Sequence, residues 1–496
     1  MRRLRLGSIA AALALAASVL VPAAAQANPA SAPAVPLASL SSGKTDAAGN
    51  PLDHWATRGA APLAASPLTT PAGSAAPDDP TMADCPPGLH CVIVPAAYRL
   101  NSADPSDYGN YDKANRPADG NKITGVVIHD TEGTLQSALA EFQNPLAYVS
   151  AHYVIDSDGT IYIVVSPHNI GWQAGNWYLN VHTVGIEHVG HAISGATDYT
   201  SAMYNSSATL VRWLSSNYGF SLDRQHVIGH DNVPGPTQIS VAGMHWDPAA
   251  FWNWDRYMAL MGAPIRPTAG PEAKLVTITP NWATNQPVVT SCDSTTHVCT
   301  TLPRQSANFV YLRQAPSETA PLLTDLAIHS DGSPGTTHID DWSATADYGQ
   351  TFAIADRQGP WLAIWYGGQK GWFRQFNLPG GFTVMGSSGQ FITPRAGLTS
   401  IPVYGRAYPA ASAYPADGSI PVQSVVPLNY TIAAGQSYST TGAVGSDYGY
   451  YWTIDSRLPN DHTTVFGPAS DRYYPIQFNH RLAYVKASDV QMIGAR

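Results

Sequence analysis

The chain has 496 residues, a length that suits about three folded units. Its 35 aspartates and glutamates against 26 lysines and arginines give a formal net charge of −9. This acidic excess, with no long basic run and no interleaving of basic and aromatic residues, argues against nucleic acid as a partner. No spacing typical of a P-loop or a dinucleotide site occurs either.

The first 27 residues have the pattern of a secretory signal peptide. Arginines stand at positions 2, 3 and 5, an apolar run covers residues 9–21, and Ala-Gln-Ala at residues 25–27 offers a cleavage site. The apolar run is short and Ala-rich for a permanent span, so an uncleaved anchor is the weaker alternative. No later stretch is apolar enough to cross a membrane. We therefore expect a secreted protein with no membrane contact after cleavage.

Residues 28–84 are rich in Ala, Pro, Ser and Thr and hold few large apolar side chains. Such a composition cannot bury enough surface to fold, which predicts a disordered linker or pro-region.

Residues 85–262 are expected to form an α/β domain, with its core in residues 123–262. The β-branched run at 126–128 predicts a buried strand. Asp-Ser-Asp-Gly at 156–159 lies between two apolar runs and predicts a hairpin, with the glycine at a positive φ. Helical spacing follows twice, in two sets of apolar residues: Leu135, Leu139 and Phe142, then Tyr204, Ala208, Val211, Leu214 and Tyr218. The expected fold is a mixed β-sheet flanked by helices.

From about residue 264 helical periodicity ends, and short β-rich runs alternate with turn residues. We predict a linker with a disulfide loop at residues 263–307, followed by two small all-β, SH3-like barrels at 308–376 and 401–490. An aromatic residue beside a cation near the end of each module, in WYGGQKGWF and RLAYVK, is typical of a closing strand in such barrels.

The four cysteines form two local pairs, Cys85 with Cys91 and Cys292 with Cys299. An even number in an exported chain indicates disulfides, and the short spacing favours pairing within each pair. Neither pair has the CxxC spacing of many zinc sites, which makes metal binding the weaker alternative.

Three other side chains suggest a metal centre. His129 and His230 each follow a β-rich run directly, and Asp247 could add a carboxylate. A catalytic zinc site needs three such protein ligands and one open position. The alternative is that these side chains cap loops, because the chain has 16 histidines and the three candidates are far apart in sequence.

Five segments resemble, in order, the conserved blocks of one family: VVIHDTEG, SAHYVIDSDGTIYIVV, NVHTVGIEHVG, VIGHDNVPGPT and MHWDPAAFWNW. The family is that of the zinc-dependent N-acetylmuramoyl-L-alanine amidases, which includes phage lysozyme-type amidases and is similar to peptidoglycan recognition proteins. The resemblance covers residues 123–262. It implies an enzyme with one zinc ion per chain that cleaves the amide between N-acetylmuramic acid and the L-alanine of the peptidoglycan stem, using zinc-activated water.

The resemblance also implies roles for single residues. His129, His230 and Asp247 match the zinc ligands, and Glu187 matches the carboxylate that activates the water. Other members use a Tyr where this chain has Ala151, so Glu187 would have to carry that role.

The chain departs from the family's pattern at two positions. His245 replaces the usual Lys two residues before the third ligand, where a protonated His could stabilise the oxyanion. Gln173 stands where a His is common. Substrate contacts are expected at His152, Trp172 and Gln173, although His152 could equally be a hydrogen-bonded core residue.

The main alternative function is a recognition protein that binds muropeptides without cleaving them, and a zinc hydrolase with another substrate is a third. All three ligand positions hold competent residues, which favours the enzyme. We expect a monomer associated with the cell wall, in which the C-terminal modules tether a catalytic domain that works without them.

Overall fold

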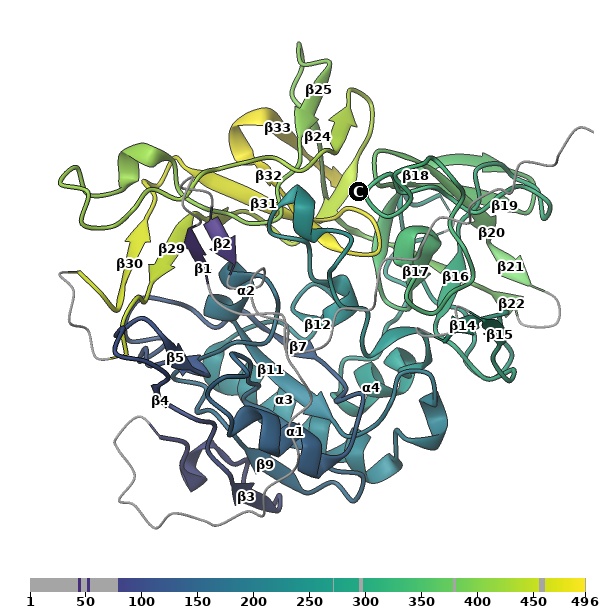
Figure 1. Cartoon of the computed structure of the whole chain (residues 1–496). Coiled ribbons are helices and arrows are strands. Elements are labelled where there is room, and N and C mark those ends of the chain that lie inside the picture. The colour runs from purple at the N-terminus through teal and green to yellow at the C-terminus, as the bar shows by residue number, and fades with distance from the viewer. Residues whose placement is uncertain are drawn as a thin grey trace, which may run out of the picture. The chain divides into compact units, whose positions relative to one another are not determined.

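A computed structural model describes residues 43–45, 51–53, 79–270, 272–293, 298–377, 381–454 and 460–495 (Figure 1). The expected signal peptide and most of the expected linker at 28–84 lie outside these residues. Within the linker range, β1 (Gly43–Thr45) pairs with β2 (Pro51–Asp53), and η2 (Met82–Asp84) forms a 3-10 turn. Among the helices of the described ranges, none has the length and apolarity that a membrane crossing requires.

A six-stranded mixed sheet forms the centre of the α/β domain, with strand order β12-β7-β11-β8-β9-β3. The strands are β12 (Val227–Gly229), β7 (Gly125–Ile128), β11 (Thr183–His188), β8 (Tyr153–Ile155), β9 (Ile161–Ile163) and β3 (Cys91–Ile93). The first four are parallel neighbours, and β8 and β9 pair antiparallel. Gly159, between them, has a φ of +87°. The mixed sheet and the hairpin are confirmed.

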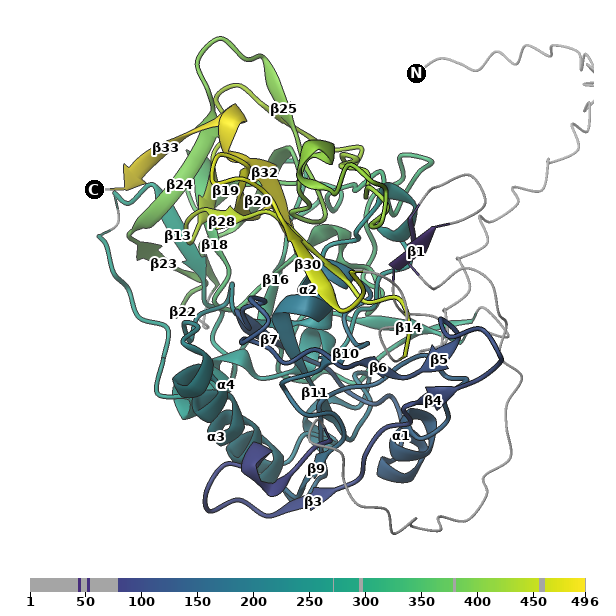
Figure 2. The same cartoon turned by 90° about the vertical axis from the view of Figure 1, so that its left-hand side faces the viewer.

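Helices cover both faces of this sheet because its side chains alternate in direction and both sets are apolar. Val126 and Ile128 pack with α3 (Ser201–Tyr218) and α4 (Trp254–Leu260), which lie side by side (Figure 2). The opposite face contacts α1 (Leu135–Phe142) and α2 (Trp177–His182). Both predicted amphipathic helices are thus confirmed, as α1 and α3.

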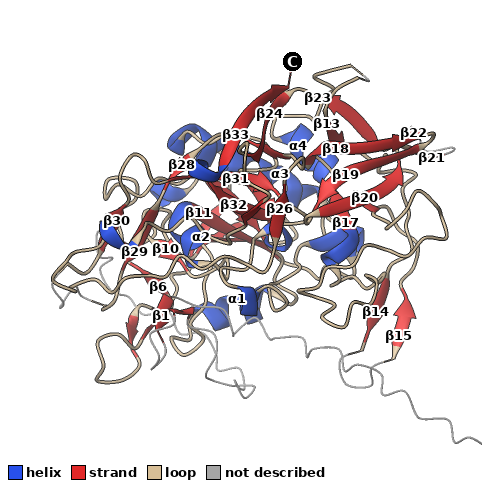
Figure 3. Ribbon diagram, turned by 90° about the horizontal axis from the view of Figure 1, so that it is seen from above, coloured by secondary structure: helices blue, strands red, loops and turns tan. Residues whose placement is uncertain are grey.

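The C-terminal half is built of strands and loops (Figure 3). One antiparallel sheet has the order β20-β19-β18-β13-β23. Its members are β13 (Leu275–Ile278), β18 (Thr351–Gln358), β19 (Trp361–Tyr366), β20 (Gln369–Arg374) and β23 (Val384–Ser387). A second has the order β28-β31-β27-β24-β33, with β32 added beside β31. Its members are β24 (Gly389–Pro394), β27 (Tyr438–Thr440), β28 (Val444–Gly445), β31 (Arg472–Gln477), β32 (Leu482–Lys486) and β33 (Val490–Ala495).

Shorter strands form two-stranded pairs around these sheets. In the N-terminal half they are β4 (Arg99–Leu100) with β5 (Tyr108–Gly109), and β6 (Tyr111–Asp112) with β10 (Ile170–Gly171). In the C-terminal half they are β14 (Thr290–Cys292) with β15 (Cys299–Thr301), β16 (Phe309–Tyr311) with β17 (Thr345–Asp347), β21 (Phe376–Asn377) with β22 (Gly381–Phe382), β25 (Ser400–Pro402) with β26 (Thr431–Ala433), and β29 (Asp447–Tyr450) with β30 (Thr463–Phe466).

The β-rich character of this half is confirmed, but its organisation differs from the expected boundaries. β13 lies in the range expected to be a linker, residues 263–307, and pairs with both β18 and β23. A strand paired on both sides belongs to the folded sheet. The SH3-like barrel type stays a prediction. Both predicted disulfides are present, Cys85–Cys91 and Cys292–Cys299.

The two-stranded pair of β29 and β30 packs on the α/β domain where β29 contacts α2. Trp177 Nε1 donates to the Gly449 carbonyl oxygen at 2.9 Å. Both ring nitrogens of His182 face acceptors, the Lys122 carbonyl at 2.9 Å and Asp447 Oδ1 at 2.8 Å. Burial opposes a charge on His182, but the Asp447 carboxylate and these hydrogen bonds outweigh it and raise the pKa of His182. The two regions therefore share a buried polar contact.

Candidate metal centre

The register of the parallel strands places three candidate residues in one row. Gly229 of β12 and Ile186 of β11 both stand opposite Ile128 of β7. The residues that follow, His230, His129 and Glu187, therefore lie level with one another at the carboxyl ends of three adjacent strands. This edge is where open α/β sheets usually bind ligands.

Asp247 completes the group from a separate loop. Its Oδ2 lies 3.1 Å from Nδ1 of His129, and its Oδ1 lies 3.1 Å from Nδ1 of His230. One ligand atom from each of the three residues falls within 4.8 Å of the others, and all three side chains are buried. The backbone N–H of Asp231 donates to the carbonyl of Asp247 at 2.9 Å, which joins this loop to the end of β12.

A chain of hydrogen bonds fixes the tautomer of His129. The Thr183 hydroxyl donates to the Leu179 carbonyl at 2.6 Å, so its oxygen must accept from Gln173 Nε2 at 2.8 Å. The amide oxygen of Gln173 then faces His129 Nε2 at 2.8 Å and accepts a hydrogen bond from its N–H. In the neutral ring a proton on Nε2 leaves the lone pair on Nδ1, the nitrogen that faces the Asp247 carboxylate.

An imidazole nitrogen and a carboxylate oxygen that face each other at 3.1 Å can share a cation, and the electrostatics of the neighbouring groups agree with one. Burial lowers the pKa of His230 to about 3, so its imidazole is neutral. Burial opposes the charge of Asp247, but the three imidazoles around it outweigh that effect and hold its pKa well below the usual value. Two imidazole nitrogens and one carboxylate are a donor set that zinc prefers.

Glu187 lies beside this group without a partner of its own. It is 5% exposed, and its Oε2 has no hydrogen-bond partner among the described residues. Burial raises the pKa of Glu187 well above its usual value, and the Asp247 and Asp130 carboxylates raise it further. An unpaired buried carboxyl group with a raised pKa, next to a metal-type cluster, is typical of an acid–base group.

His245 also lies at the cluster. Its ring stacks on that of His230 with 4.9 Å between centroids, and its Nδ1 is 3.5 Å from Asp247 Oδ1. Its Nε2 has no hydrogen-bond partner among the described residues. His245 therefore lies at the candidate site, and its Nε2 remains available for a hydrogen bond to a ligand.

The contacts of His152, Trp172 and Gln173 do not support direct substrate binding. His152 is fully buried, and its ring nitrogens meet Arg116 at 3.0 Å and the Gly185 N–H at 3.0 Å. Trp172 Nε1 donates to Asp112 at 2.6 Å. Gln173 lies behind His129, where it orients the ring. These three residues support the framework, because their polar side-chain atoms bond to protein groups.

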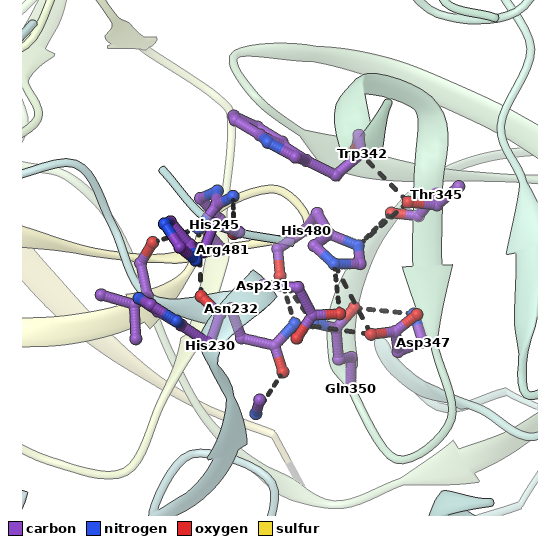
Figure 4. A network of polar contacts seen from close by, with 12 residues as sticks. His230, Asp231, Asn232, His245, Trp342, Thr345, Asp347, Gln350, His480 and Arg481 are labelled. Carbon is purple, nitrogen blue, oxygen red and sulfur yellow. Dashed lines mark hydrogen bonds and ion pairs between the residues drawn. The ribbon is translucent and has the colours of Figure 1, made fainter. Parts of the chain in front are cut away.

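Sequence reasoning missed two residues from the C-terminal region, His480 and Arg481. Arg481 reaches the loops of both His230 and Asp247, and His480 reaches Asp231 beside His230 (Figure 4). The only signal was the cation that opens the RLAYVK segment, and it indicated a closing strand rather than a functional site.

Comparisons with known proteins identify the family of the chain. The family model described as N-acetylmuramoyl-L-alanine amidase matches residues 119–250. N-acetylmuramoyl-L-alanine amidase A of Achromobacter lyticus is 32% identical over 169 residues, which are 32% of this chain and 91% of that protein. Among solved structures, an AmpD derivative is 23% identical with a TM-score of 0.27 and covers 36% of this chain and 96% of its own. AmiD from E. coli is 21% identical with a TM-score of 0.25 and covers 30% of this chain and 60% of its own. From the match to the Achromobacter enzyme over nearly its whole length, we conclude that the chain belongs to the N-acetylmuramoyl-L-alanine amidase family.

Proposed function

We propose that this protein is a secreted zinc hydrolase that cleaves the amide between N-acetylmuramic acid and L-alanine in peptidoglycan. The observation that carries the proposal is the arrangement of His129, His230 and Asp247, in which a fixed imidazole lone pair faces a carboxylate at 3.1 Å. Family membership supplies the reaction class. The predicted signal peptide and the two disulfides support export.

His129 and His230 would hold the zinc ion through Nδ1, and Asp247 through its carboxylate. When bound, zinc supplies Lewis acidity, which acidifies water and polarises an amide carbonyl. Gln173 keeps His129 in the tautomer that binds metal, because its amide oxygen accepts a hydrogen bond from Nε2–H.

Glu187 is the proposed acid–base residue. Its position level with the two histidines, its burial and its unpaired Oε2 allow it to take a proton from water. The same carboxyl group then returns the proton to the departing amino group of L-alanine. His245 is proposed to donate from Nε2 to the oxygen that gains charge during attack.

The alternative is a recognition protein that binds muropeptides without cleaving them. A buried carboxyl group with an oxygen that lacks a hydrogen-bond partner among the described residues costs stability, and a binder has no use for it. Glu187 therefore favours the enzyme over the binder.

The test combines metal analysis with mass spectrometry of a peptidoglycan digest. We expect one zinc per chain, and release of intact stem peptides with an N-terminal alanine by the zinc-loaded protein only. His129→Ala should lose both zinc and product. His226→Ala should keep both. His226 is a half-buried histidine that precedes the N-terminal end of β12, whereas His230 follows its C-terminal end. Muropeptide binding without product from the zinc-loaded protein would support the binder instead.

A further inference from the structure

Arg481, from the segment just before β32, connects the two loops that carry the metal-binding residues. Its Nη1 donates to the carbonyl oxygens of His230 at 3.2 Å and Val233 at 2.6 Å. Its Nη2 donates to those of Met244 at 3.3 Å and His245 at 2.7 Å. One side chain therefore holds the backbone on either side of the cluster, although it lies more than two hundred residues away in sequence (Figure 4).

The guanidinium group of Arg481 is itself fixed in place. Its central carbon lies 4.4 Å from the ring centroid of Trp342, which belongs to η7 (Trp342–Ala344). Both side chains are buried, at 2% and 5% exposure. A planar guanidinium stacked on an aromatic ring presents its donors in a rigid fork, which suits it to orient several carbonyl groups at once.

His480 makes a second connection to the residues that directly follow His230. Its Nε2 lies 3.0 Å from Asp231 Oδ2 and 3.6 Å from Asp347 Oδ2. Its carbonyl oxygen accepts from Asn232 Nδ2 at 3.2 Å. Residues 230–232 are therefore bound to the C-terminal region through backbone and side-chain contacts.

We propose that Arg481 is a positioning residue of the metal centre, and that the C-terminal β region is a structural part of the catalytic unit. This inference rests on the proposed function. The direction of an imidazole ring follows its backbone, and Arg481 bonds the carbonyl groups of both His230 and His245. Without the guanidinium, four buried or part-buried carbonyl oxygens would lose a donor, and the two loops would lose their common support. The sequence predicted a catalytic domain that works without its C-terminal modules. In the present proposal those modules complete the metal centre instead.

The test uses the full chain with Arg481→Lys, Arg481→Ala and the control Ile476→Ala. Ile476 is a fully buried core residue of β31 in the same sheet, and no polar contact links its side chain to the metal-binding loops. For each protein we would measure the melting temperature, the dissociation constant for zinc by competition with a chelator, and the visible spectrum with Co²⁺ in place of zinc. kcat and KM on a soluble muropeptide complete the set.

Both Arg481 variants should bind zinc about 10- to 100-fold more weakly, the range seen when a group that orients a ligand is removed. Their Co²⁺ spectra should change, and kcat should fall more than KM rises. Lysine should not rescue the site, because a single ammonium group cannot serve four carbonyls on two loops. Ile476→Ala should lower the melting temperature and leave zinc affinity and spectrum as in the wild type.

Three results would overturn the inference. The first is wild-type zinc affinity and an unchanged Co²⁺ spectrum in both Arg481 variants. The second is failure of both variants to fold while Ile476→Ala folds, which would make Arg481 a purely structural residue. A wild-type protein that binds no zinc would instead overturn the proposed function, and this inference with it.

Discussion

Replacement of Gln173 by methionine tests whether the tautomer of His129 controls metal binding. Methionine has a similar volume, and its thioether sulfur is a far weaker hydrogen-bond acceptor than an amide oxygen. In the metal-free variant, His129 can move its proton to Nδ1 and donate to Asp247 Oδ2, 3.1 Å away. In the metal-bound variant, the proton must stay on Nε2, where no acceptor remains. The missing hydrogen bond therefore destabilises the metal-bound state and not the metal-free one, which weakens zinc binding.

The size of the effect follows from the buried N–H group. A buried donor without an acceptor costs about 1 to 3 kcal/mol. Since about 1.4 kcal/mol corresponds to a tenfold change in an equilibrium constant, zinc affinity should fall by roughly 5- to 150-fold. Gln173→Glu keeps an acceptor at the same place and should retain zinc affinity better than Gln173→Met does.

The assay is a competition titration with a zinc chelator, supported by nitrogen NMR of the His129 ring in the metal-free proteins. The control is Gln436→Met. Gln436 is a buried glutamine just before β27 of the second C-terminal sheet, and its side chain donates to the Gly368 carbonyl oxygen. It should lower stability and leave zinc affinity unchanged. A folded Gln173→Met protein with wild-type affinity would refute the reasoning.

Three further predictions concern the general base, the C-terminal region and pH. Glu187→Gln should lower turnover by about 10²- to 10⁴-fold with one zinc per chain retained; near-normal turnover with full zinc would contradict the assignment. A chain that ends at Gly262 lacks Arg481 and should lose activity on soluble muropeptides as well as on insoluble wall, and full activity on the soluble substrate would contradict this. The pKa of His182 is higher in the folded protein than in the unfolded chain, where it is about 6.5. The stability from its ion pair with Asp447 is therefore fully present below about pH 6.5, and it is lost as pH rises through the pKa of His182 in the folded protein. Asp447→Asn should therefore lower the melting temperature most at acidic pH, by the equivalent of about 1.5 to 3 kcal/mol, and a difference that does not shrink at higher pH would exclude this ion pair as the cause.

Local patterns in the sequence were sufficient for the elements of the α/β domain. The spacing of Tyr204, Ala208, Val211 and Leu214 predicted α3, whose buried face contains these residues. Asp-Ser-Asp-Gly predicted the hairpin between β8 and β9 because a positive φ at its last position favours glycine. The short spacing of the cysteines likewise predicted both disulfides. These features depend on neighbours in sequence, which a single chain displays directly.

Tertiary structure decided the organisation of the C-terminal half and the support of the metal centre. The sequence showed that β strands would form after residue 264, but it could not show that β13 pairs with β18 and β23, because strand pairing is set by contacts between distant segments. The candidate ligands were identified from the family blocks, whereas Gln173 was expected to touch substrate and is found behind His129. Arg481 carries no local mark of its role, because that role consists of four hydrogen bonds to carbonyl groups, which every residue type possesses. The ligand chemistry of the centre could therefore be predicted from residue types and family blocks, whereas the distant groups that hold it in place come together only in the folded chain.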